Sequence, residues 1–232
     1  MKKTIKIAGL LVFALASLAT LSVPASAITY NFQCITNNNA SNCAIGEAQL
    51  TMVVASFSDS LGQGVGFTFY NTAVNPASIT DVYFDDGLLG TGVLAQPMRV
   101  INNNPIAPPN ATPVSFSPLA TPANLPGGNP IGFTTTTGFS ADSDNPITQR
   151  GVNEANESVT IAFAFRGSNT LADVIQALNS GALRVGLHVQ SIGATGGSEG
   201  FVNIVPEPGF YGLLALGLGG LFLAARRRQT QP

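Results

Sequence analysis

The chain has 232 residues, of which 45% are hydrophobic and only 9% are charged. Six of its ten lysines and arginines lie within the first six and the last seven residues, and the stretch Ile28–Pro206 keeps four arginines, eleven acidic residues and no lysine. The formal charge of that stretch is −7. It therefore lacks the basic surface needed to bind DNA, RNA or anionic lipid, and we exclude nucleic acid as a partner.

The N-terminus has the three parts of a secretory signal peptide. Three lysines are followed by an apolar run, Ile7–Leu21, and then by Ala25 and Ala27 in a small-residue A-x-A pattern. The apolar run is too short for a stable span, which needs about 20 residues. We predict that residues 1–27 direct the chain to the Sec translocon and that signal peptidase cleaves after Ala27.

The only two cysteines, Cys34 and Cys43, have eight residues between them. In an exported protein this arrangement favours a disulfide. A metal pair or a redox pair is the alternative, but the spacing is not C-x-x-C and no histidine lies nearby in the sequence. We predict a structural Cys34–Cys43 disulfide and no metal site at these residues.

Alternation of apolar and polar residues with period two dominates the middle of the chain. It is clearest in Ile28–Cys34, Val65–Phe69, Val159–Phe165 and Leu183–Gln190, and weaker in two further predicted strands, Glu47–Phe57 and Gly132–Phe139. Clusters of Gly, Asn, Pro and Asp separate these runs. The pattern predicts an all-β fold, in which residues 28–204 form one antiparallel β-sandwich or jelly roll.

The run Ile79–Gly87 contains the most suggestive polar face. Alternation places Val82 and Phe84 in the core and points Asp81, Tyr83 and Asp85 outward together. An aromatic ring between carboxylates can stack on a sugar, and the carboxylates could also hold Ca²⁺. The simpler interpretation is a solvated strand face that ends in an Asp-Gly turn.

Two segments interrupt the strands. Residues 97–130 contain nine of the fifteen prolines and three consecutive asparagines, a composition that favours a long extended loop. Leu171–Leu178 has an apolar stripe, with Thr170 and Asp173 in capping-box spacing before it and Gly181 as a stop after it. We predict one short helix there.

The C-terminal residues form a tripartite pattern of a Pro-Glu-Pro motif, an apolar run of 17 residues and a basic cluster. In order these are Val205, Pro206, Glu207 and Pro208, then Gly209–Ala225, then Arg226, Arg227 and Arg228. A helix of 17 residues covers about 25 Å, less than the hydrocarbon core of about 30 Å, so the run is at the short limit for a span. The three arginines are expected to stay cytoplasmic, which leaves the middle of the chain outside. A permanent single-pass anchor is the alternative to a sorting signal.

The pattern at 205–228 resembles the PEP-CTERM signal of Gram-negative bacteria, which exosortase-type enzymes process. The resemblance implies a transient transmembrane helix at 209–225, processing near Pro-Glu-Pro, and delivery to the cell surface or extracellular matrix. It also implies an association with exopolysaccharide and biofilm, but no reaction. Blocks of the middle domain look like those of exported PEP-CTERM proteins of uncharacterised function.

The sequence does not favour catalysis. A G-x-S-x-G match at Ser198 is followed by a predicted strand rather than a helix, and His188, the only histidine, precedes it. Paired carboxylates such as Asp81 and Glu157 lack a fixed separation and a tryptophan platform. We expect no enzyme and no obligatory cofactor. We expect a structural or adhesive surface protein, with a polysaccharide-binding module, which could be Ca²⁺-dependent, as the alternative.

Overall fold

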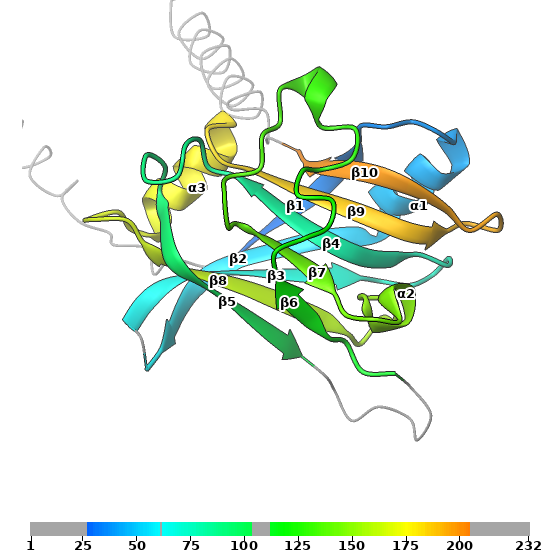
Figure 1. The fold of residues 1–232 in the computed structure, drawn as a ribbon, viewed down its shortest axis with the longest axis horizontal. Helices are drawn as coiled ribbons and strands as arrows, with labels where there is room; N and C mark the ends of the chain where they lie inside the picture. The colour runs from blue at the N-terminus through cyan, green and yellow to red at the C-terminus, as the bar shows by residue number, and fades with distance from the viewer. Residues whose placement is uncertain (1–26, 61, 104–111, 205–232) are drawn as a thin grey trace, which may run out of the picture.

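The computed structural model describes residues 27–60, 62–103 and 112–204. They form an antiparallel sheet of ten strands in the order β5-β8-β3-β2-β1-β10-β9-β4-β7-β6, which folds over into two layers (Figure 1). The strands are β1 (Ile28–Cys34), β2 (Leu50–Asp59), β3 (Gly62–Asn71), β4 (Ser78–Asp85), β5 (Leu94–Asn103), β6 (Phe116–Pro118), β7 (Ser140–Ser143), β8 (Ser158–Phe165), β9 (Arg184–Ile192) and β10 (Gly197–Asn203). The prediction of a single all-β domain is confirmed.

Strand β1 belongs to both layers. Its first half pairs with β2, from Ile28 opposite Val54, and its second half pairs with β10, where Phe32 lies opposite Asn203. The two layers enclose the apolar residues of the alternating runs, which form the main hydrophobic core. At the centre, the ring of Phe84 lies 5.0 Å from that of Phe67 and 4.9 Å from that of Phe163, measured between centroids, in edge-to-face contact.

The two outer strands of the sheet, β5 and β6, face each other without a backbone ladder. The Asn102 side chain bridges them, because its Oδ1 accepts from the Phe116 N–H at 2.8 Å and its Nδ2 donates to the Phe116 carbonyl at 3.4 Å. Pro97 lies within the register irregularity where β5 pairs with β8. A proline and a bridged edge both discourage pairing with another chain.

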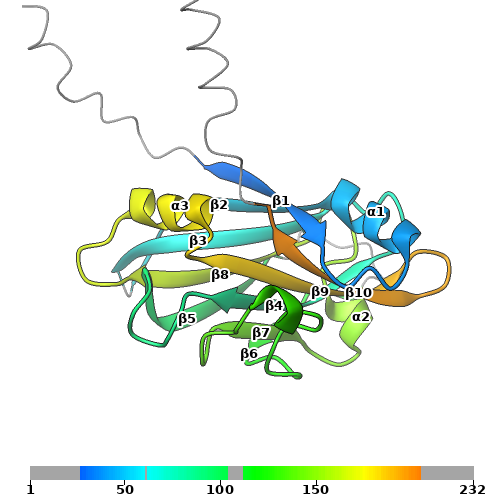
Figure 2. The same cartoon turned by 90° about the horizontal axis from the view of Figure 1, so that it is seen from above.

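The predicted helix is present as α3 (Leu171–Ser180), with the capping box of Thr170 and Asp173 and a left-handed Gly181 at its end. The prediction of only one helix is wrong. The structure also contains α1 (Ala40–Gln49), the single-turn α2 (Ile147–Arg150) and a 3₁₀ turn, η1 (Asn129–Ile131). Figure 2 shows α1 and α3 beside different parts of the sheet.

Helix α1 begins at an Asn39 cap, whose side chain accepts from two backbone N–H groups, and Cys43 joins its first half to Cys34 at the end of β1. The Cα atoms of the two cysteines are 5.3 Å apart, and the predicted disulfide is confirmed. The residues of α1 that are buried are Asn42, Cys43, Gly46 and Gln49. Because three of these are polar or lack a side chain, the sequence carries no apolar stripe to reveal the helix.

Both of the weaker strand predictions need correction. The run Glu47–Phe57 begins in α1, and β2 starts only at Leu50. The run Gly132–Phe139 is not a strand; Phe133 and Phe139 are buried, but they belong to two different apolar clusters. The proline-rich segment 97–130 is only partly loop, because it includes the end of β5, the short β6 and η1.

No helix in the part of the chain that the structure describes is long and apolar enough to cross a membrane. Most of the predicted signal peptide, including Ala25, lies outside the described residues, as do the predicted span 209–225 and the arginine cluster.

Candidate functional site

The predicted ligand face of Asp81, Tyr83 and Asp85 is not open to solvent, and that prediction is wrong. The three residues do point away from the core that contains Val82 and Phe84, but Tyr83 is 0% exposed and Asp81 is 1% exposed. Residues 119–136, which we call the covering segment, lie over this outer face of β4 and β9. The proline-rich chain therefore buries the ring that alternation alone would leave free.

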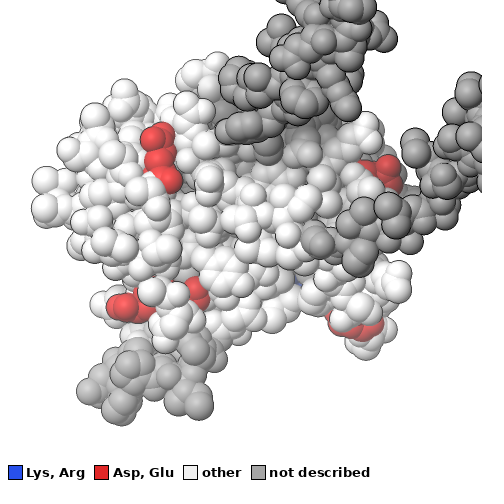
Figure 3. All heavy atoms as spheres, turned by 180° about the vertical axis from the view of Figure 1, so that it is seen from behind, with Lys and Arg blue, Asp and Glu red and all other residues white. Residues whose placement is uncertain are grey.

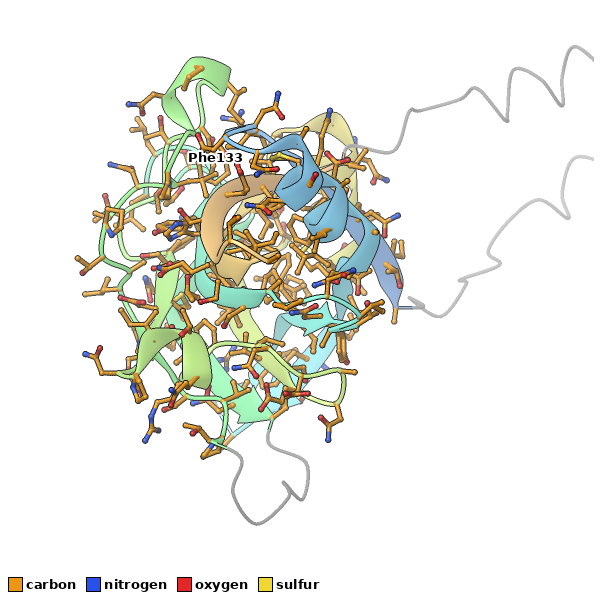
Figure 4. The ribbon with its side chains drawn as sticks, turned by 90° about the vertical axis from the view of Figure 1, so that its right-hand side faces the viewer. Phe133 is labelled. Carbon is orange, nitrogen blue, oxygen red and sulfur yellow. A yellow bond between two sulfur atoms is a disulfide. The ribbon has the colours of Figure 1, made fainter. Side chains whose placement is uncertain are left out.

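Two glycines let the covering segment approach the sheet. A Cβ on Gly186, which lies opposite Tyr83 in the ladder, would stand 2.6 Å from the Leu125 side chain. A Cβ on Gly200 would overlap the Pro126 carbonyl oxygen. Phe133, labelled in Figure 4, packs in the same small cluster as Tyr83. The outer face is therefore a second, smaller core.

A row of ionisable side chains crosses three neighbouring strands beneath the edge of the covering segment. Asp81 of β4 lies opposite His188 of β9 and opposite Asp142 of β7. The His188 Nδ1 is 2.9 Å from the Asp81 Oδ2, which also accepts from the Thr80 hydroxyl at 2.8 Å. The Asp81 Oδ1 is buried and has no hydrogen-bond partner among the described residues.

Burial is the main cause of the raised pKa values of Asp142 in this row and of the neighbouring Tyr83. Burial, and then the Asp81 charge, raise the pKa of Asp142 to about 6. Burial and the same two carboxylates raise the pKa of Tyr83, whose hydroxyl donates to the Pro122 carbonyl at 3.0 Å. A protonated Asp142 can donate toward Asp81, so the pair holds one negative charge more easily than two.

Asp85 lies at the end of β4 and forms an ion pair with Arg184 of β9. The Arg184 guanidinium stacks over the Phe133 ring at 5.2 Å and its Nη1 donates to the Ile131 carbonyl at 2.8 Å. Asp85 also accepts from the Thr134 N–H at 3.1 Å. The pair thus fastens the covering segment beside an open cleft of about 490 Å³.

Three buried carboxylates hold loops through backbone N–H groups. Asp86 accepts from Val93 and Leu94, Glu157 from Asn153 and Glu154, and Glu199 from Asn38 and Asn39, all at 2.8–3.1 Å. Burial raises the pKa of Asp86 and that of Glu157. The sequence does not reveal these roles, because loops that are distant in sequence supply some of the N–H donors.

The described residues offer a poor fit to a metal. The one group of three potential ligands within 4.8 Å of one another is Cys34, Cys43 and Glu199, and the disulfide removes both thiolates. Asp85, one of the two carboxylates considered for Ca²⁺, is taken up by Arg184. A calcium site on the predicted face is therefore not supported by this geometry.

Ser198 lies in β10 directly after the turn from β9, whereas His188 contacts Asp81. The G-x-S-x-G match is thus part of a β-hairpin rather than a strand-to-helix elbow.

The comparison with family models decides the role of the C-terminal residues. A model described as the PEP-CTERM protein-sorting motif matches residues 205–228, and this match begins directly after the last described residue. The chain carries a PEP-CTERM sorting motif. No curated protein and no solved structure shows significant similarity to the chain. The PEP-CTERM match means that the protein is exported, associates with the membrane, is sorted to the cell surface and is a substrate for an exosortase-type enzyme.

Proposed function

We propose that the sandwich is a structural component of the cell surface or extracellular matrix, without enzymatic activity. The observation that supports this best is the use of its charged side chains. Asp86, Glu157 and Glu199 hold loops, and Arg184 fastens the covering segment. Figure 3 shows one face with a few separate acidic patches and almost no basic surface.

Such an arrangement favours a rigid domain over a reactive site. An active site usually brings ionisable groups with perturbed pKa values to a cleft. Here the row of Asp81, Asp142 and His188 lies beneath the covering segment, and the His188 side chain is 13% exposed. The Sec translocon and signal peptidase are the partners we propose for export.

The test uses the bacterium that produces the protein. Cells that lack the protein are complemented with the wild-type chain, with a sorting variant in which Pro206, Glu207 and Pro208 become alanine, or with Asp142→Asn/His188→Gln. We expect weaker cell aggregation under shear without the protein and with the sorting variant. The wild type and the Asp142→Asn/His188→Gln variant should both restore it. Failure of the latter variant, at a normal surface amount, would point to chemistry at the row.

Polysaccharide binding is our second candidate function, and we place it in a different site from the buried Tyr83. A cleft of about 400 Å³ lies at the end of the sandwich where β4 begins, away from Asp85. Its lining includes polar side chains that suit hydroxyl-rich ligands, among them Ser78, Thr148, Asn153, Glu154 and Ser191. Saturable binding of the protein to a polysaccharide panel, lost in Glu154→Ala and retained in Tyr83→Phe, would favour this function. The absence of binding to any member, with the protein folded, would leave the structural role.

A further inference from the structure

We propose that one end of the sandwich lies against the lipid bilayer while the C-terminal segment holds the precursor in the membrane. This membrane-facing end is formed by Leu88, Leu89, Ile131 and Ile204. The contact is apolar, and its partner is the headgroup and upper acyl region of a phospholipid leaflet. The inference rests on the sorting motif and not on the structural or binding role proposed for the surface protein.

The chain leaves the fold with almost no linker. Strand β10 ends at Asn203, and the Ile204 N–H still donates to the Asn31 carbonyl at 2.9 Å. The sorting motif starts at the next residue, and the apolar run starts at Gly209. An extended chain covers at most about 3.6 Å per residue, so Gly209 lies within about 18 Å of Ile204.

That length leaves little space between the domain and the bilayer. The headgroup region on each side of the hydrocarbon core is about 5–7 Å thick. If the apolar run starts at the hydrocarbon boundary, Ile204 stands at most about 11–13 Å from the headgroups even with a fully extended chain. A less extended chain brings the surface around Ile204 closer to the lipid.

The strand registers place the other three residues at this same end. Val202 lies opposite Gly186 and Asp85 lies opposite Arg184, so the chain leaving β10 reaches the level at which β4 ends. Leu88 and Leu89 follow directly in the loop after β4. Arg184 holds η1 and its Ile131 at the same level, and Figure 1 shows η1 and the end of β10 in the upper part of the molecule.

The leucines are displayed by a fixed loop. Leu88 is 79% exposed and Leu89 is 53% exposed. The Asp86 carboxylate holds the far side of the loop at Val93 and Leu94, and the Thr91 N–H donates to the Leu88 carbonyl at 2.9 Å. Two neighbouring leucines are thus exposed in one held loop, and contiguous exposed apolar patches mark sites of contact with proteins or membranes.

The charges at this end favour lipid over a charged protein partner. Asp85 and Arg184 neutralise each other in the wall of the cleft that Leu88, Gly132 and Ala182 also line. Ile131 is 41% exposed and Ile204 is 43% exposed, which continues the apolar character around the exit of the chain. Arg166 lies beside Gly90 in the loop that contains the leucines and offsets the charge of Asp86, so the charges near the loop balance. Such a surface suits a zwitterionic bilayer, and the tether makes even a weak contact effective.

The natural chain contains no tryptophan, so one introduced indole reports its own surroundings. The full-length protein is reconstituted into phosphatidylcholine vesicles as Leu88→Trp or, as a matched control, Val74→Trp. Val74 is 81% exposed in the loop that precedes β4, at the opposite end of that strand. We expect Leu88→Trp to shift its emission to the blue and to lose most of it to lipids brominated on the acyl chain. Val74→Trp should emit as in water and resist quenching.

A second reporter and a linker variant complete the test. Leu89→Trp should behave as Leu88→Trp, which guards against a local defect in one variant. A long Gly-Ser linker inserted after Ile204 should reduce quenching at Leu88→Trp, because it lowers the effective concentration of the bilayer. Water-like emission from both leucine reporters would overturn the proposal. Quenching that requires the processing enzyme in the vesicle would also overturn it, in favour of a protein contact.

Discussion

Replacement of Asp142 by asparagine should stabilise the domain at neutral pH. Burial and the Asp81 charge raise the pKa of Asp142 from 3.8 to about 6. A carboxyl whose pKa is higher in the folded state contributes stability that is complete below pH 3.8 and is lost as the pH rises through 6. At pH 7.5 the wild-type domain therefore carries an unfavourable ionised Asp142 that the variant lacks.

The magnitude follows from the size of the shift. The difference between 3.8 and about 6 corresponds to about 3 kcal/mol, and the partial exposure of Asp142 reduces this to about 1–2 kcal/mol through solvent screening. Asparagine also keeps an acceptor for the Thr121 N–H and adds a donor that can reach the unpartnered Asp81 Oδ1. Both effects act in the same direction.

The assay is chemical denaturation of the disulfide-intact Ile28–Ile204 domain, followed by circular dichroism at pH 4 and at pH 7.5. The free energy of unfolding of Asp142→Asn should exceed that of the wild type at pH 7.5 and approach it at pH 4. Asp144→Asn is the matched control, because hydrogen bonds from Ser115 and Ser117 lower the pKa of Asp144 and removal of its charge should destabilise the domain at pH 7.5. A loss of stability in Asp142→Asn at pH 7.5 would refute the reasoning.

Three further changes test the contacts that hold loops to the sandwich. Removing the disulfide, whose cysteines are nine positions apart, as Cys34→Ser/Cys43→Ser should cost about 2.5–3 kcal/mol in denaturation under oxidising conditions. Gly200→Ala should destabilise the domain by about 1–3 kcal/mol and speed proteolysis of the covering segment, whereas Gly66→Ala, with no neighbour closer than 3.4 Å, should change either property little. Glu199→Gln should lower stability by about 1–3 kcal/mol and speed amide exchange in the loop before α1; unchanged exchange would contradict its role as an acceptor.

The sequence predicts best where a local signal and the fold agree. The strict alternation of Val159–Phe165 and Leu183–Gln190 is reproduced by β8 and β9, and the capping box of Thr170 sets the start of α3. In each case one face or one stripe must be buried, whatever the rest of the chain does. The Cys34–Cys43 pairing also follows, because the chain offers no other partner for either thiol.

The outward face of β4 shows what local signals cannot give. Alternation correctly separates Tyr83 from Val82, but which face meets water depends on where the proline-rich segment packs. That packing needs Gly186 and Gly200 on two other strands, so it appears only once the sheet order is known. The partnership of Asp81 with Asp142 and His188 depends on register in the same way.

The scarcity of cations helps to explain how the domain handles its acidic residues. With no lysine in Ile28–Pro206, most carboxylates cannot find a basic partner, and several accept from backbone N–H groups of loops instead. In these contacts the carboxylates point into the loops whose N–H groups they accept from. One of them, in which Asp86 accepts from Val93 and Leu94, holds the loop that contains Leu88 and Leu89. The charge pattern that excludes nucleic acid thus also leaves few charges at the apolar end that we propose faces the bilayer.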